Sequence, residues 1–326
     1  MWTKPYGMKE GFFIGGGLII VGLLLQLCAG PVDWDVFRWP VNGIVLAVFL
    51  ALIAIIYLLR KRMYGLQFIG TYKAAIPALV YAVVLTIIMG LTPQKSLIPG
   101  SSLPTGEESM WISYMLNFWP FVLIYVYIAV ILGLIILRRA FHSPLSPLNL
   151  KRDIPFLLNH LGLFLAMTTA TLGNADMQRL KMITVKGEPE WRALTPQQQI
   201  VEMPITIELK EFVMETYDDG SPRRFASDII ITPRNPLTTQ RSSLTSDIVA
   251  TVEVNKPVEV DGWKIYQYGY DTQMGAMSQI SILELVSDPW LPLVYTGIYM
   301  MLAGAVCMFL FGGRKKVENR PINSKS

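Results

Sequence analysis

Six apolar runs, each long enough to cross a lipid bilayer as a helix, constrain this chain more than any other feature. A spanning helix needs about 20 residues to cross a hydrocarbon core about 30 Å thick. Apolar residues make up 52% of the sequence and charged residues only 16%, which is unusual for a soluble protein. We therefore expect a polytopic α-helical membrane protein with six transmembrane helices. The runs cover residues 11–29, 41–59, 74–91, 118–137, 154–172 and 290–312.

Basic residues outside the long polar segment concentrate in the connections that would lie on one side of the membrane. The first and third connections carry one basic residue each, Arg38 and Lys95. Cytoplasmic loops hold the excess of Lys and Arg, so both termini are predicted to be cytoplasmic, in agreement with the even number of spans. The net charge of +4 thus reflects a lipid bilayer as partner and gives no reason to expect nucleic acid. Outside the segment 173–289, the other basic groups flank the opposite ends of the runs: Lys4, Lys9, Arg60, Lys61, Arg62, Lys73, Arg138, Arg139, Lys151, Arg152, Arg314, Lys315, Lys316, Arg320 and Lys325.

The polar segment between the fifth and sixth spans, residues 173–289, is predicted to be an extracytoplasmic all-β domain. Residues 204–210 alternate apolar and polar side chains, as a strand with one buried face does, and residues 227–232 supply a partner strand. Residues 258–266 have the pattern of a tight hairpin, because their central Asp-Gly pair tolerates positive φ. Further alternating runs occur at residues 249–254 and 279–286.

Aromatic residues recur along the strand that ends this hairpin. Tyr266, Tyr268 and Tyr270 stand at every second position, with Trp263 close by. A period of two predicts that the three tyrosines share one face. Such a stripe is more typical of a sheet core or an interface than of a cofactor site.

The chain has two histidines, and one of them, His160, lies inside an apolar run. A metal-competent imidazole in hydrocarbon is a candidate functional site, and imidazole is the usual axial ligand of haem iron. The alternative is a packing histidine bonded to neighbouring backbone or to Thr168 or Thr169. At 1.5 Å per residue, His160 lies roughly 9 Å into the membrane. The other histidine, His142, is expected in a solvated cytoplasmic loop rather than in a metal site.

Several classes of chemistry lack the residues that they need. The sequence has no phosphate-binding Gly-x-x-x-x-Gly-Lys-Ser/Thr motif and no Cys-x-x-Cys pair. Its two cysteines, Cys28 and Cys307, belong to different spans. No histidine falls in the outer segment, so a hydrolytic triad there is excluded. We therefore assign no catalytic residue.

Several short motifs occur together in a fixed order along most of the chain. On these motifs, from about Ala74 to Gly312, the chain resembles the ResB/CcsB family of cytochrome c biogenesis proteins. The most specific of them is Asn255-x-Pro257 with Gly262 and Tyr266-Gln267. The motifs are His160-Leu-Gly-Leu-Phe-Leu165, Pro204-Ile-Thr-Ile-Glu-Leu-Lys-Glu-Phe212, Glu215-Thr-Tyr-Asp-Asp-Gly-Ser-Pro222, Phe225-Ala-Ser-Asp228, Val254-Asn-Lys-Pro257, Asp261-Gly-Trp-Lys-Ile-Tyr-Gln-Tyr-Gly-Tyr270 and Asp288-Pro289.

The resemblance implies system II cytochrome c maturation in the cell's inner (cytoplasmic) membrane. A ResB-type protein and a CcsA-type partner carry haem b across the membrane and present it for attachment to apocytochrome c. By this resemblance His160 is one axial ligand of haem iron within the membrane, and the second comes from the partner. The tryptophan-rich haem motif of CcsA is absent, so the chain resembles the unfused ResB half of a holocytochrome c synthase and is not catalytic alone.

The same pattern predicts five regions along the chain. The first helical pair is additional to the simplest ResB pattern. An alternative from another functional class also fits the sequence: a membrane-anchored assembly scaffold, in which the β domain binds partners and His160 only packs. A transporter for a different ligand is disfavoured, because the spans hold no paired charges. The regions are 1–62 (extra helical pair), 63–172 (ResB-like helices three to five), 173–289 (β domain), 290–313 (sixth helix) and 314–326 (cytoplasmic tail).

Overall fold

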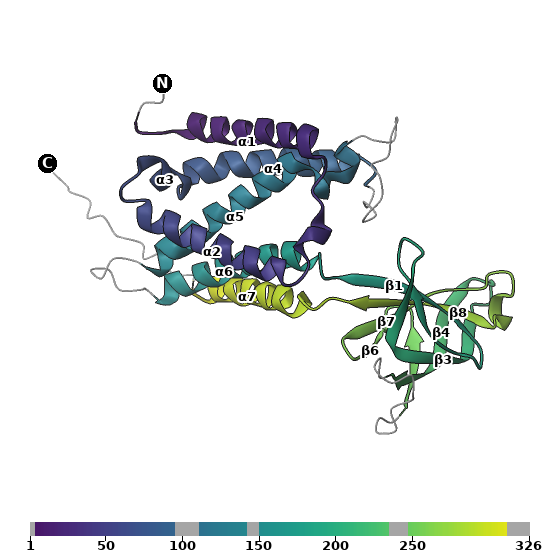
Figure 1. Ribbon diagram of the computed structural model, residues 1–326. Helices are drawn as coiled ribbons and strands as arrows, with labels where there is room; N and C mark the ends of the chain where they lie inside the picture. Colours follow the sequence, from purple (N-terminus) through teal and green to yellow (C-terminus); the bar gives the residue numbers. More distant parts are fainter. Residues whose placement is uncertain (1–3, 95–110, 142–149, 235–246, 312–326) are drawn as a thin grey trace. The chain divides into compact units, whose positions relative to one another are not determined.

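The computed structural model describes residues 4–94, 111–141, 150–234 and 247–311. The chain divides into two compact units (Figure 1). One contains residues 1–175 and 290–326 and is helical; the other contains residues 176–289 and is built of strands. His142 and the predicted tail at 314–326 lie outside the described residues.

Within its described residues, the helical unit contains six helices that are long and apolar enough to cross a membrane. They confirm the six predicted spans, and the chain is a multi-pass membrane protein. The sheet unit lies between the fifth and sixth of them, also as predicted. The cytoplasmic placement of the termini stays a prediction from charge. The long helices are α1 (Met8–Ala29), α2 (Val41–Leu59), α4 (Tyr72–Leu91), α5 (Trp119–Ala140), α6 (Leu150–Gly173) and α7 (Leu291–Phe311); shorter ones are α3 (Tyr64–Ile69) and the 3₁₀ turns Trp34–Phe37 and Trp111–Asn117.

Helices α6 and α7 cross at two glycines. A Cβ atom on Gly162 would lie 2.5 Å from the carbonyl oxygen of Gly297, and a Cβ on Gly297 would lie 2.6 Å from that of Gly162. Only glycine fits at both positions without moving backbone. Small residues allow this close approach, which drives helix association where the hydrophobic effect is absent.

On another face, α6 packs into a cluster of buried side chains from α2 and α5. Phe164 of α6 stacks parallel to Phe49 of α2 at 6.3 Å between ring centroids. The hydroxyl of Tyr125 in α5 donates a hydrogen bond to the carbonyl of Met167, 3.1 Å away. The cluster thus fixes which face of α6 looks towards α2 and α5. Its buried members are Ile53, Ala129, Leu132, Leu134, Ile136 and Phe164.

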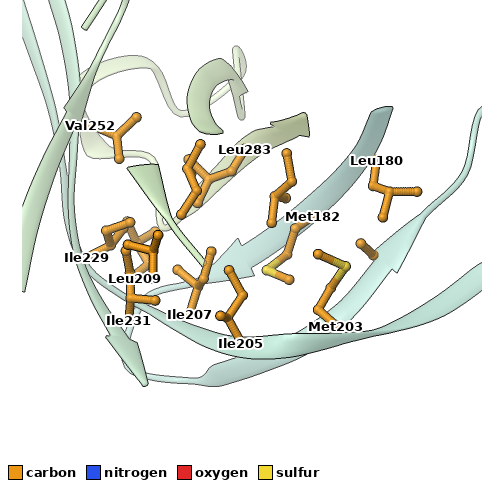
Figure 2. Packing of buried hydrophobic residues seen from close by; sticks show 14 residues of the cluster. Leu180, Met182, Met203, Ile205, Ile207, Leu209, Ile229, Ile231, Val252 and Leu283 are labelled. Atoms are coloured by element: carbon orange, nitrogen blue, oxygen red, sulfur yellow. The ribbon is translucent and has the colours of Figure 1, made fainter. Parts of the chain in front are cut away.

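The described part of the second unit forms an eight-stranded antiparallel sheet in the order β5-β4-β3-β2-β1-β8-β7-β6. Its edge strands, β5 and β6, contact each other, so the sheet curls around a single core of Ile, Leu, Val and Met side chains (Figure 2). The first and last strands, β1 and β8, pair along their whole lengths. The strands are β1 (Gln178–Val185), β2 (Pro189–Leu194), β3 (Ile200–Thr216), β4 (Pro222–Pro233), β5 (Ile248–Glu253), β6 (Val258–Val260), β7 (Trp263–Tyr270) and β8 (Ile280–Ser287).

The strands predicted from alternation are all present. Residues 204–210 fall in β3 and pair with β4, and the predicted hairpin is β6–β7. Its turn residues Asp261 and Gly262 have φ values of 49° and 78°, as the Asp-Gly pair predicts.

The tyrosine stripe of β7 is broken, which corrects the prediction of one shared face. The pairing register shifts between Gln267 and Gly269, where two steps on β7 match one step on β8. Such a bulge reverses the side to which the following residues point. Tyr270 accordingly stacks on Phe212 and on Phe225, at 4.9 and 5.2 Å, while Tyr268 is exposed.

Candidate functional site

His160 lies in the first half of α6 and is half-buried. Its Nδ1 atom is 2.8 Å from the carbonyl oxygen of Phe156, one turn earlier. A carbonyl only accepts hydrogen bonds, so Nδ1 carries the proton and donates. In the neutral ring the lone pair then lies on Nε2, and no described residue hydrogen-bonds to that atom. A donor contact from the opposite nitrogen is the usual support of a metal-binding histidine.

The ring of Phe156 lies against the imidazole. Their centroids are 3.8 Å apart and the planes differ by 22°. The guanidinium carbon of Arg139, in the last turn of α5, is 5.3 Å from the centre of the same phenyl ring. Arg139 also forms an ion pair with Asp153, whose side chain is only 7% exposed. The side chains from Arg139 through Phe156 to His160 therefore form one continuous set of contacts.

The alternative in which His160 packs by bonding to Thr168 or Thr169 is wrong. The hydroxyls of Thr168 and Thr169 donate to the carbonyls of Phe164 and Leu165 within α6. His160 bonds to backbone instead. A histidine that only packs and a histidine that binds iron can both make this backbone bond. The two roles of His160 are therefore distinguished by what its Nε2 atom contacts.

The face of α6 that holds His160 differs from the face that holds α7. Successive residues are about 100° apart around a helix. The α7 contact is made by Gly162 and by Asn159, against which a Cβ on Gly304 would clash at 2.5 Å. His160 is turned away from both. It lies between Phe156 and Phe164, on the side that packs against α2 and α5.

A cavity of about 600 Å³ lies next to this contact set, within the helical unit. Its walls come from the segment before α1, from α3 to α6 and from the α3–α4 connection. Its basic residues are part of the charge pattern that orients the helices, but the cavity itself was not predicted from the sequence. The charged and aromatic lining residues are Tyr6, Tyr64, Phe68, Tyr72, Lys73, Arg138, Arg139 and Phe156.

Across the described parts of the chain, no group of three or more His, Cys, Asp or Glu side chains could hold a metal ion by itself. A metal at His160 would need ligands from elsewhere. A porphyrin meets this need because it supplies four nitrogen ligands to its own iron, and one protein imidazole then fills a single axial position. His160, with its Nδ1 bonded to backbone, has the chemistry to supply that one ligand.

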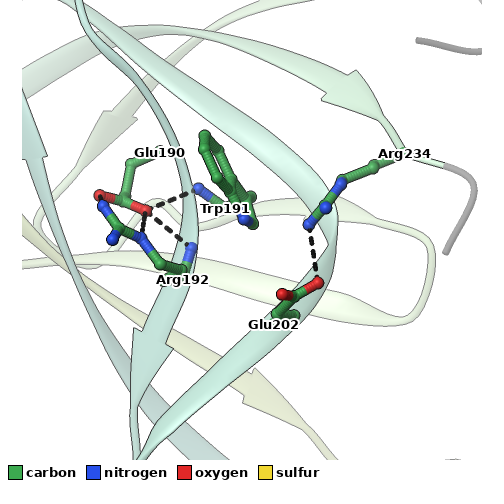
Figure 3. Close-up of polar contacts among 5 residues, drawn as sticks. All are labelled: Glu190, Trp191, Arg192, Glu202 and Arg234. Atoms are coloured by element: carbon green, nitrogen blue, oxygen red, sulfur yellow. Dashed lines mark hydrogen bonds and ion pairs between the residues drawn. The ribbon is translucent and has the colours of Figure 1, made fainter. Parts of the chain in front are cut away.

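Polar contacts in the sheet unit are of a different kind. Glu190 accepts hydrogen bonds from the side chain of Arg192 and from the amides of Trp191 and Arg192, and Arg234 pairs with Glu202 (Figure 3). The bonds from Arg192 lower the pKa of the Glu190 carboxyl. The Glu190–Arg192 contacts lie within β2, whereas the Arg234–Glu202 pair joins the end of β4 to β3.

Inside the sheet, three polar side chains satisfy one another. Ser227 donates to the amide oxygen of Gln267 at 2.6 Å and lies 2.7 Å from the hydroxyl of Ser281. Gln267 donates onward to the carbonyl of Gly269, at the bulge of β7. A buried network in which each member has partners is structural.

Comparison with known proteins gives a match to a family model and matches to solved structures. Residues 151–281 match the model of the ResB-like family. A solved structure of cytochrome c heme lyase CcmF aligns with 82% of this chain at 14% identity and a TM-score of 0.35. The chain spans 45% of the length of that structure. No curated protein matches the chain.

The family segment includes His160 and its contacts in α6, together with strands β1 to β7. These are the regions whose motifs carry the resemblance seen in the sequence. The resemblance to the ResB family is thus confirmed for residues 151–281, which match the model of the ResB-like family.

Proposed function

We propose that this chain is the ResB-type subunit of a system II cytochrome c synthase. Together with a CcsA-type partner it carries haem b across the membrane for attachment to apocytochrome c. The observation that carries the proposal is the state of His160. Its Nδ1 is bonded to backbone, and its Nε2 is free of hydrogen bonds from described residues. It also lies within a ResB-like segment.

The need for a partner follows from the histidine count. Haem iron offers two axial positions, but only His160 lies within an apolar span, whereas His142, the other histidine, is expected in a solvated cytoplasmic loop. The sheet unit contains no histidine. The second axial imidazole, and any imidazole that holds haem outside the membrane, would come from the CcsA-type protein.

The role of this chain is then to bind and orient haem, its substrate. Bound haem iron supplies the affinity for Nε2, and this offsets the cost of a polar group in the membrane. The Phe156 carbonyl fixes the imidazole tautomer, and the Phe156 ring limits rotation of the imidazole. The sheet unit is proposed to dock the partner and apocytochrome c. No group of this chain is proposed to perform the attachment chemistry.

The test is haem content in the co-expressed complex. The wild-type pair should purify with a bis-histidine haem spectrum, and His160→Ala should lose most of it. His142→Ala, which removes the other imidazole, is the matched control and should keep the spectrum. Added imidazole should restore absorbance to the His160→Ala complex, because a free imidazole can occupy the vacated position; a lost packing contact would not be repaired in this way.

The scaffold alternative makes the opposite forecast. It expects normal haem in the His160→Ala complex and loss of partner association when the 255–270 hairpin is disrupted. Normal haem in that variant would overturn the proposal. Haem attachment to apocytochrome c by this chain without any partner would also contradict it.

A further inference from the structure

A group of basic residues surrounds α3, at the end of the helices that the charge distribution assigns to the cytoplasm. Between residues 59 and 75 the sequence holds four basic residues and no acidic one. Arg60, Lys61 and Arg62 follow the end of α2, and Lys73 lies in the first turn of α4. Clusters of Lys and Arg beside spanning helices attract the acidic headgroups of the cytoplasmic leaflet. Charge alone gives a diffuse attraction, so a defined site also needs a cavity.

Lys73 lines the cavity of about 600 Å³ and brings a positive charge to it. Its Nζ atom uses one donor on the carbonyl of Tyr6, 3.4 Å away. An ammonium group has three N–H donors, so Lys73 keeps the capacity for two more hydrogen bonds. The carboxylate of Glu10 attracts Lys73, but it also accepts a hydrogen bond from the amide of Gly7 at 2.6 Å. The two arginines of the wall are bonded to other groups of the protein and are not counted as ligand groups.

A second cation lies at Tyr64, another residue of the cavity wall. The Nζ atom of Lys4 is 4.9 Å from the centre of the Tyr64 ring. The Tyr64 hydroxyl accepts a hydrogen bond from the amide of Tyr6 at 3.2 Å, which leaves its own O–H as a donor. Two ammonium groups and one hydroxyl thus meet at or beside this wall, and each can donate to a phosphate oxygen.

The cavity wall continues into apolar surface of the kind that lies against lipid. Tyr72 belongs to the wall and is exposed. Further along α4, Ile76, Val80 and Val83 are exposed as well. Spacings of three and four residues place these four side chains on one face of the helix. A molecule whose anionic group is bound at Lys73 can therefore lay apolar chains along α4.

We propose that this cavity binds an anionic phospholipid of the cytoplasmic leaflet. Lys73, Lys4 and the Tyr64 hydroxyl bind its phosphate, and the exposed face of α4 contacts its acyl chains. A volume of about 600 Å³ lies within the range of pockets that bind small molecules, roughly 300–1,000 Å³. One bound lipid would join the segment before α1 to α3 and α4. Neither haem nor the CcsA-type partner is needed for this binding.

The test counts the lipid that the full chain retains in a mild detergent. The purified chain is incubated with equal amounts of dioleoylphosphatidylglycerol and dioleoylphosphatidylcholine and analysed by native mass spectrometry. Wild type should retain phosphatidylglycerol in preference. Lys4→Gln/Lys73→Gln should reduce this retention about tenfold, through loss of two charge-assisted contacts. Phosphatidylglycerol should also raise the Tm of wild type more than that of the variant, because a ligand that binds only the folded chain stabilises it.

Three control variants separate the cavity from general charge and from misfolding. Lys61→Gln/Arg62→Gln removes the same charge from exposed positions outside the cavity wall and should retain phosphatidylglycerol like wild type. Lys4→Arg/Lys73→Arg keeps both charges and should retain most of the lipid. Lys4→Gln alone changes an exposed side chain ahead of α1, so it provides the test if loss of Lys73 unfolds the protein, and it should weaken retention severalfold.

Equal retention of phosphatidylglycerol by wild type and by Lys4→Gln/Lys73→Gln would overturn the proposal. An equal loss in Lys61→Gln/Arg62→Gln would also overturn it, because general charge would then hold the lipid. Soluble competitors test the acyl chains. Dihexanoylphosphatidylglycerol should displace the bound lipid at a lower concentration than glycerol 3-phosphate, which has the phosphate without the chains. Equal potency of the two would make this a site for soluble phosphate esters and would contradict the lipid assignment.

Discussion

The two units of this protein differ in where their large apolar side chains lie. The sheet unit buries them in a core, whereas the helical unit leaves many of them exposed on its surface. In the sheet unit, Ile207 and Ile231 are fully buried in the core. In the helical unit, Leu91 and Phe309 are 81% and 88% exposed. The same residue types are stable in both places because the solvent differs. Water drives them inward, whereas lipid accepts them on the outside and leaves helix association to close packing.

The two units also differ in the hydrogen-bond partners of their buried polar side chains. The sheet unit joins Ser227, Gln267 and Ser281 into one buried network of side chains. In the helical unit, buried side chains with amide groups bond to backbone: Gln26 accepts from the amide of Trp119, and Asn42 donates to the carbonyl of Leu172. His160 follows the helical pattern through Nδ1 only, which leaves Nε2 available to a ligand.

The largest effect is expected where helix packing alone holds the structure. Gly162→Val would put side-chain atoms where Gly297 backbone now lies, and α6 and α7 would have to separate. We expect loss of the folded protein from detergent extracts, measured by size-exclusion chromatography. Gly17→Val in α1, where an added Cβ meets nothing within 4 Å, should behave like wild type. Equal yields of the two variants would contradict a packing role for the α6–α7 crossing.

A smaller effect is expected in the sheet core, where burial from water supplies the stability. Ile207→Ala should cost about 2–5 kcal/mol, the usual range for such a truncation, and lower the Tm of the sheet unit. Residues 176–289 form a compact unit with a core of their own and paired first and last strands, so they can be tested alone by thermal melts.

Ile183→Ala in β1 is the matched control for that truncation. Its side chain is 46% exposed, so the same substitution should change stability by less than about 1 kcal/mol. If both variants melted at the same temperature, the burial assigned to Ile207 would be wrong.

Much of this fold follows from residues that are close in sequence. The six spans are continuous apolar runs, and the β6–β7 turn needs only Asp261-Gly262. Strands β1 and β2 were not predicted. In β1 the apolar Ile183 lies on the exposed face between buried Met182 and Thr184, so the period of two is blurred. The bulge in β7 also went unseen, although Gly269 marks it.

The candidate site was predictable in part. The position of His160 within an apolar run was visible in the sequence. The proton position on its ring was not, because it depends on a carbonyl contact in the folded helix. The cavity could not be found either. Lys73 and Arg138 belong to helices far apart in sequence, and only tertiary packing brings them to one wall.

The smallest effect on stability is expected from an ion cluster of Arg224, Glu253 and Glu215 at the surface of the sheet unit. Arg224 donates to Glu253 at 2.7 Å and to Glu215 at 3.0 Å. The hydrogen bond from Arg224 lowers the pKa of the Glu253 carboxyl. A carboxyl whose pKa is lower in the folded state adds stability above its unfolded pKa and loses it as the pH falls through the folded value.

Arg224→Ala should therefore lower the Tm of the sheet unit slightly at pH 7, where Glu253 is charged in both states. The difference from wild type should shrink as the pH falls below about 4, the unfolded range of a glutamate, and vanish once Glu253 is protonated in the folded protein. Arg223→Ala removes the same charge from the neighbouring exposed position, outside this cluster, and should show no such pH dependence. A Tm difference between Arg224→Ala and wild type that persists unchanged at pH 2 would mean that Arg224 stabilises the sheet by packing of its side chain rather than through charge.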